Sequence, residues 1–124
     1  MPIAVIGGLR VRAAWAAPEF AFRSFLALRQ ARRAQGCLGA QVFPGPEGFF
    51  SLTLWDSAAA MKSYATTGAH GRLLRRAPVI AEVFRFHHFP AEVMPEPAEA
   101  RAHWYAAQHG LQGENGMDLP GRGA

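Results

Sequence analysis

Apolar runs along the chain predict the strands. Residues 3–12 are largely apolar and contain no proline, which predicts a first strand, and the pair Gly7-Gly8 within it indicates a bulge or a close approach to the backbone. Two β-rich runs, 37–43 and 49–55, flank a Pro/Gly cluster and predict an antiparallel hairpin. The alternating aromatic run 84–89 predicts a fourth strand.

A first helix is predicted over residues 18–35, because a Pro-Glu pair suits its first turn and Gly36 ends it. Its apolar periodicity is imperfect. Arg29 and Arg33 continue the angular sector that begins with Phe22. We therefore expect the C-terminal half of this helix to leave the core or to meet a partner.

Two more helices follow. The first of them spans residues 58–66 and is capped by Asp56 or Ser57. After it we expect a short turn over 69–76 that ends before Pro78, and then a last helix over 96–109.

The order of these elements is strand, helix, strand, strand, helix, strand, helix, which is typical of the ferredoxin-like split βαβ fold. We predict an α+β domain over residues 1–110, with a four-stranded antiparallel sheet, helices on one face and an extra C-terminal helix. The other face needs cover, and pairing of two sheets in a homodimer is a common way to supply it. Residues 111–124 are Gly-rich and polar and are predicted to be a flexible tail.

The composition of the chain restricts the classes of molecule that it is expected to bind. The chain has 124 residues, half of them hydrophobic, with 13 Lys and Arg against 9 Asp and Glu. The excess cations fall in 10–33 and 72–85, while 92–118 is mostly acidic. No recognised nucleic-acid motif accompanies them, so nucleic acid is not an expected partner.

The single cysteine, Cys37, excludes an intrachain disulfide and a cysteine metal cage, which fits a reducing cytoplasm. No apolar run approaches the roughly 20 residues that a membrane span needs, and no basic region precedes the first apolar run as in a signal peptide. We expect a cytoplasmic protein that does not insert into a membrane and does not have a membrane as a partner.

Residues 51–70 resemble the antibiotic biosynthesis monooxygenase superfamily of dimeric α+β barrels. The resemblance rests on a strand that ends in Leu54-Trp55, a serine-capped helix, the aromatic Tyr64, and His70 after a break of small residues. Within the superfamily the chain looks most similar to the branch of spheroidene monooxygenase, because His70 is followed by the Leu-Leu-Arg-Arg run 73–76 and, more weakly, because of the segment 95–110.

The resemblance implies oxidation of a hydrophobic or aromatic small molecule by oxygen. Many relatives need no metal or organic cofactor, whereas spheroidene monooxygenase is haem-associated, so haem stays an alternative. Haem degradation is not supported. Members with that activity carry a Trp at the place of Tyr64, their iron-binding His where this chain has Leu74, and an Asn on the first strand, where this chain has Gly7-Gly8. A non-catalytic ligand-binding or dimerisation module on the same fold is the rival interpretation.

The candidate catalytic residues are His70, as a base, and Tyr64, as an orienting donor. Arg72, Arg75 and Arg76 would lower the pKa of His70 by like-charge repulsion if they lie close. The structural alternatives are that His70 bonds a backbone carbonyl and that the Tyr64 hydroxyl points to solvent. We expect both side chains to meet in one pocket.

Substrate-binding residues are expected on the strands. Alternation places Phe49, Ser51, Thr53 and Trp55 on one mixed face of the second hairpin strand, with Trp55 as a pocket wall or a core residue. Phe86 and one of His87 and His88 are expected to complete the wall.

A metal site is not expected. His87 and His88 are adjacent on a strand and point to opposite faces, so both cannot bind one ion. His103 and His109 are six positions apart, roughly 120° around a helix. Arg10 and Ala13 stand where a dinucleotide-binding loop would need further glycines.

Overall fold

The fold is seen in a computed structural model that describes residues 2–45, 48–109 and 116–117. Its elements, in chain order, are β1 (Ile3–Val11), a 3-10 turn (Ala14–Ala16), α1 (Ala17–Arg33), β2 (Cys37–Pro44), β3 (Phe49–Trp55), α2 (Ala58–Thr66), α3 (Gly68–Ile80), β4 (Ala81–Pro90), α4 (Pro97–His109) and β5 (Gly116–Met117).

The strands form one sheet in the order β2-β3-β1-β4-β5, and every neighbouring pair is antiparallel. Strand β1 is central, with Ile6 opposite Leu52 of β3 and His87 of β4. This arrangement confirms the ferredoxin-like α+β fold predicted from the order of the elements.

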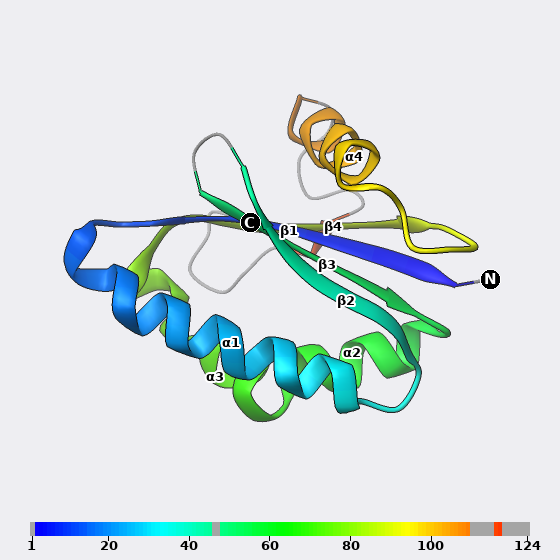
Figure 1. Ribbon diagram of the computed structural model, residues 1–124, viewed down its shortest axis with the longest axis horizontal. Helices are drawn as coiled ribbons and strands as arrows, with labels where there is room; N and C mark the ends of the chain where they lie inside the picture. Colours follow the sequence, from blue (N-terminus) through cyan, green and yellow to red (C-terminus); the bar gives the residue numbers. More distant parts are fainter. Residues whose placement is uncertain (1, 46–47, 110–115, 118–124) are drawn as a thin grey trace.

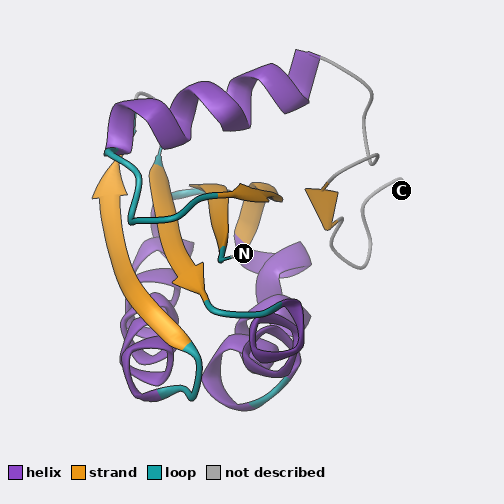
Figure 2. Ribbon diagram, turned by 90° about the vertical axis from the view of Figure 1, so that its right-hand side faces the viewer, coloured by secondary structure: helices purple, strands orange, loops and turns teal. Residues whose placement is uncertain are grey.

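Helices cover both faces of the sheet (Figure 2). Helices α1, α2 and α3 lie on one side and α4 on the other (Figure 1). Successive side chains of β1 point to opposite faces of the sheet and so contribute to both layers. Val5 belongs to the core under α1–α3, whereas Ala4 and Ile6 belong to the core under α4. The sequence predicted helices on one face and an extra C-terminal helix without placing that helix. The structure places it on the face that was expected to stay open.

Helix α4 is anchored by Trp104, which is 6% exposed. A Cβ atom on Gly8 would lie 2.2 Å from the Trp104 ring, so glycine is needed beneath it. The indole Nε1 of Trp104 donates to the carbonyl oxygen of Arg85 at 3.1 Å, and the Arg85 guanidinium donates to the carbonyl oxygen of Trp104 at 2.9 Å. The same guanidinium lies 4.1 Å from the centre of the indole ring. Of the two explanations for the Gly7-Gly8 pair, close approach is the one observed.

The short turn expected over residues 69–76 is wrong, because α3 is a helix of 13 residues that contains Pro78. Leu73, Ala77 and Ile80 are buried in the core and hold the last turn in helical form. Arg12 donates to the carbonyl oxygens of Pro78 at 2.9 Å and Val79 at 3.1 Å, which satisfies acceptors at the end of the helix. Packing and this cap outweigh the helix-breaking tendency of proline.

The predicted tail, 111–124, lies mostly outside the described residues. Within it, Gly116–Met117 pairs with Phe86 and His87 of β4. None of the helices in the described part of the chain has the length and apolar character to cross a membrane.

Candidate functional site

A cavity of about 380 Å³ lies between α1 and the sheet and reaches α2 and α3. Most of its wall is apolar, and none of the described residues that line it is charged. Six polar side chains line it: Ser24, Gln41, Ser51, Thr53, Tyr64 and His70. Such a space suits an uncharged, largely hydrophobic molecule.

Strand β3 turns its mixed face toward this cavity. Phe49, Ser51 and Thr53 line it, as the alternation of the strand requires. Trp55 continues the same face but is fully buried, and its Nε1 donates to Thr53 Oγ1 at 2.7 Å. Trp55 lines a small space of about 20 Å³ that Tyr64 also lines, and its ring centroid is 4.9 Å from that of Tyr64. Trp55 therefore supports the wall of the main cavity without lining it.

Tyr64 projects from α2 into the cavity rather than into solvent. Its hydroxyl donates to the carbonyl oxygen of Ala27 on α1 at 3.2 Å. Burial raises the pKa of the phenol well above its ordinary value, so the hydroxyl stays protonated. Tyr64 thus ties α2 to α1 and presents a ring and a hydroxyl oxygen to the cavity.

His70 lies near the start of α3 and is 7% exposed. Its Nδ1 is 3.0 Å from the carbonyl oxygen of Ala65 and must carry the proton, because a carbonyl can only accept. Burial lowers the pKa of the imidazole, which favours the neutral ring. Nε2 then holds a lone pair and has no hydrogen-bond partner among the described residues.

The cause predicted for this pKa shift is not the one observed. The sequence attributes it to repulsion by neighbouring arginines, but Arg72 and Arg75 are exposed and Arg76 is bonded to Glu19 on α1. Removal of the ring from water lowers the pKa of His70 instead, and the Ala65 carbonyl partly opposes that effect.

Gln30 on α1 holds this part of the site together, and nothing in the sequence singled it out. Its Oε1 accepts the backbone N–H of His70 at 2.8 Å, and its Nε2 donates to the carbonyl oxygens of Thr67 at 2.9 Å and Tyr64 at 3.3 Å. Gly68, with φ +60°, makes the turn between α2 and α3 that these bonds clamp. One amide therefore fixes both candidate catalytic residues.

Three rings meet at the inner end of the cavity. The centroid of His70 is 4.5 Å from that of Tyr64 and 5.7 Å from that of Phe86 on β4. Ser24 on α1 also lines the cavity, and its buried Oγ has no hydrogen-bond partner among the described residues. Ser24 was not foreseen either, because a serine in a helix carries no sequence sign of facing a cavity.

The two adjacent histidines of β4 lie on opposite faces, as alternation predicts, and neither lines the cavity. His87 is buried beneath α4, with its ring centroid 6.3 Å from that of His103 and its Nδ1 without a partner among the described residues. His88 lies opposite Val5 on the α1–α3 face and is partly exposed. The expectation that one of them completes the wall therefore needs correction: Phe86 occupies that place.

The described part of the chain contains no group of three or more His, Cys, Asp or Glu side chains placed to hold a metal ion. A haem fits these residues poorly. His70 Nε2 offers iron one ligand, but the described wall has no cation to face the carboxylates of haem.

Comparison by sequence finds no matching family model, and no curated protein matches either. Comparison by structure finds similar folds. PA3566 from Pseudomonas aeruginosa has a TM-score of 0.64 at 16% identity, over 74% of this chain and 95% of that one. SnoaB from Streptomyces nogalater, described as a cofactor-independent oxygenase and solved as a mutant, has a TM-score of 0.61 at 13% identity, over 77% and 98%.

A third structure, from Deinococcus radiodurans, is provisionally assigned as an antibiotic biosynthesis monooxygenase and has a TM-score of 0.62 at 18% identity, over 77% of this chain and 97% of that one. Identities this low show a shared fold and no more. The chain therefore has the α+β fold of antibiotic biosynthesis monooxygenase-like proteins.

Proposed function

We propose that the protein binds an uncharged hydrophobic or aromatic molecule in the cavity between α1 and the sheet and oxidises it with molecular oxygen. The observation that carries the proposal is a buried imidazole at the inner end of an apolar cavity, whose Nδ1 is bonded to the Ala65 carbonyl so that Nε2 is left to accept a proton. The fold shared with SnoaB, a cofactor-independent oxygenase by description, supports the same chemistry.

In this proposal His70 Nε2 removes a proton from a phenol or an activated C–H group of the substrate. The bond to the Ala65 carbonyl fixes the tautomer that leaves Nε2 free to accept. The substrate anion supplies the electrons to oxygen. One oxygen atom enters the product and the other leaves as water, so no separate reductant is required.

Two other side chains orient the substrate. The Tyr64 hydroxyl donates to Ala27, so its oxygen accepts a bond from a substrate hydroxyl while its ring forms the wall. Ser24 Oγ, buried without a partner among the described residues, donates to a substrate carbonyl.

The test is oxygen uptake with a panel of tricyclic phenols and anthrones, together with equilibrium binding of each compound. We expect His70→Asn to keep binding within about threefold but to lose turnover by the roughly 10²–10⁴-fold typical of a missing general base. Ser24→Ala is the matched control and should weaken binding with little change in turnover at saturation. Oxygen uptake that His70→Asn leaves unchanged would refute the role of His70.

The second candidate function is a non-catalytic ligand-binding module. The specific observation in its favour is that His70 and Tyr64 both bond backbone carbonyls, which gives each a structural role. Tight binding of the panel without oxygen uptake by any member would favour this function.

The remaining parts of the proposal are a homodimer, a cytoplasmic location and, as a third alternative, a haem-binding oxygenase of the spheroidene monooxygenase branch. Because α4 covers much of the face that was expected to pair, a dimer would have to use another surface, such as the outer edge of β2. Sedimentation velocity at micromolar concentration tests the dimer. A Soret band in the freshly purified protein would favour the haem alternative.

A further inference from the structure

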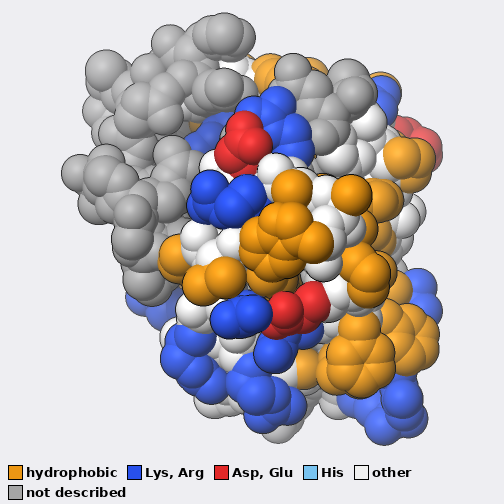
Figure 3. All heavy atoms as spheres, turned by 90° about the vertical axis from the view of Figure 1, so that its left-hand side faces the viewer, with side chains coloured by type: hydrophobic (Ala, Val, Ile, Leu, Met, Phe, Trp, Pro, Cys, Tyr) orange, Lys and Arg blue, Asp and Glu red, His pale blue; other side chains and the backbone are white. Residues whose placement is uncertain are grey.

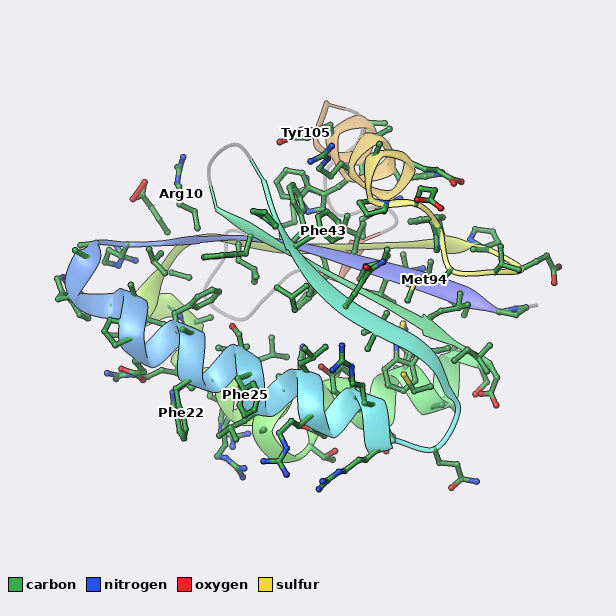
Figure 4. All side chains as sticks on the ribbon, in the orientation of Figure 1. Arg10, Phe22, Phe25, Phe43, Met94 and Tyr105 are labelled. Atoms are coloured by element: carbon green, nitrogen blue, oxygen red, sulfur yellow. The ribbon has the colours of Figure 1, made fainter. Side chains whose placement is uncertain are left out.

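The outer side of the α1–α3 layer exposes large apolar side chains. Phe22 is 63% exposed and projects from α1 on the side away from the sheet (Figure 4), and Phe25 on the same helix is 55% exposed. Trp15, just before α1, is 60% exposed, and Val79 on α3 is 44% exposed. Apolar side chains grouped on one face of a folded protein indicate an interaction surface.

The same layer is strongly cationic. Helix α1 carries four arginines, α2 one lysine and α3 three arginines, against a single acidic residue, Glu19. Glu19 is already bonded to Arg23 and Arg76. Arg29 and Arg33 on α1 and Arg72 and Arg75 on α3 are exposed. Lys and Arg side chains gather beside hydrophobic ones over the lower part of the molecule in Figure 3, where these helices lie.

The apolar surface continues into the cavity. Phe25 is exposed on α1 and also lines the cavity, and so do Val42 on β2 and Phe49 on β3, which are 40% and 44% exposed. These three side chains form an apolar mouth that opens beside the cationic layer. An apolar mouth of this kind would let a hydrophobic molecule enter the cavity.

We propose that the outer face of α1 and α3 docks on an anionic lipid bilayer and that the cavity exchanges its hydrophobic ligand with the bilayer. Arginines pair with lipid phosphates, while Phe22 and Phe25 enter the boundary between headgroups and acyl chains. This inference goes beyond the proposed function, because docking requires no reaction in the cavity. A nucleic acid would account for the arginines but not for the exposed phenylalanines or for the apolar mouth.

The experiment is flotation of the purified full-length chain with vesicles of phosphatidylcholine containing 30% phosphatidylserine, and with vesicles of phosphatidylcholine alone. We expect binding to the anionic vesicles, weaker binding to the neutral ones, and loss of binding as NaCl rises from 0.05 to 0.5 M. Circular dichroism verifies that each variant is folded.

Two pairs of variants locate the surface. Phe22→Ser should lower the partition coefficient about tenfold, whereas Val93→Ser, at a 73% exposed position between β4 and α4, should leave it unchanged. Arg33→Gln should lower it about fivefold, whereas Arg101→Gln on α4 should leave it unchanged. Phe22 and Arg33 do not line the cavity, so their effects are separate from those of ligand binding.

Several results would overturn the inference. One is the absence of binding to anionic vesicles at low salt, and another is equal binding by Phe22→Ser and Val93→Ser. Binding to duplex DNA that depends on Arg33 but not on Phe22 would assign the face to a polyanion instead. A dimer in sedimentation that Phe22→Ser dissociates would assign it to a second copy of this chain. Failure of oxygen uptake in the cavity assay would leave the vesicle result standing.

Discussion

Replacing His70 by asparagine should flatten the loss of stability that acid produces in this protein. Burial lowers the pKa of His70, so the folded chain takes up this proton at a lower pH than the unfolded chain, in which the ordinary pKa is about 6.5. The stability that comes from this difference is complete above pH 6.5 and falls as the pH drops below it. Asparagine keeps an N–H donor near the position of Nδ1 but does not titrate.

The size of the effect follows from the number of protons. Where the unfolded chain binds one proton more than the folded chain, the free energy of unfolding changes by about 1.4 kcal/mol per pH unit. The pKa of His87 is lowered as well, first by burial and then by His103, so it adds a slope of the same sign. Together the two histidines can give a slope of at most about 2.8 kcal/mol per pH unit below pH 6.5, and His70→Asn should remove the part of it that His70 supplies.

The carboxyl of Glu19 does not interfere in this window. Hydrogen bonds from Arg76 and Arg23 lower its pKa to about 2 from an ordinary value of 4.5. Its contribution is therefore present above pH 4.5 and is lost only as the pH falls from there toward 2. Below pH 4.5 its loss would add to that of the histidines.

The assay is urea unfolding at half-unit steps from pH 5 to 7.5, followed by circular dichroism and extrapolated to water. His87→Gln is the matched variant and should remove the part of the slope that His87 supplies. The ring of His70 packs between Tyr64 and Phe86, so His70→Asn should also cost about 1–3 kcal/mol at pH 7.5. The slope, and not the absolute stability, is the test. A His70→Asn variant with the wild-type slope would refute the reasoning.

Three further substitutions test particular contacts. Tyr64→Phe removes the bond to the Ala27 carbonyl and should lower the free energy of unfolding by about 0.5–1.5 kcal/mol in urea titration; no loss would contradict this bond. Gly8→Ala places a methyl group 2.2 Å from the Trp104 ring and should destabilise by about 1–3 kcal/mol and speed amide exchange in α4, whereas normal protection there would argue against this packing. Gly68→Ala puts a Cβ on a residue with φ +60° and should lower the thermal midpoint through a cost of about 1–2 kcal/mol, which an unchanged midpoint would disprove.

Much of the fold was predictable from the sequence, because the alternation of apolar and polar residues and the choice of turn residues determine secondary structure over short stretches of chain. The hairpin and the helix Ala58–Thr66 follow from such patterns. The form of α3 does not, because Pro78 argues against a helix locally while the packing of Ile80 and the cap from Arg12 are long-range effects. The sequence of α4 also does not predict which face of the sheet this helix covers. That choice depends on a long-range contact, because Gly8 on β1 leaves room for the Trp104 ring.

The site was predictable only in part, for the same reason. The resemblance in residues 51–70 pointed to Tyr64 and His70, and the structure brings their rings to 4.5 Å at one end of a cavity. Gln30 was missed because its partners lie 34 to 40 residues away in the chain. Alternation separated His87 from His88 but could not tell which face of the sheet holds a cavity, because that depends on how far α1 stands from the strands.

The chain's three tryptophans lie in three different environments, which gives the protein built-in optical probes. Trp15 is 60% exposed beside the cationic layer, where a water-borne quencher reaches it and a lipid surface would shield it. Trp55 is fully buried against Tyr64, which lines the cavity, so a ligand that shifts the Tyr64 ring would change the emission of Trp55. Trp104 lies beneath the Arg85 guanidinium and reports whether α4 is seated. Single-tryptophan variants would therefore let surface docking, ligand entry and helix release be followed separately in one molecule.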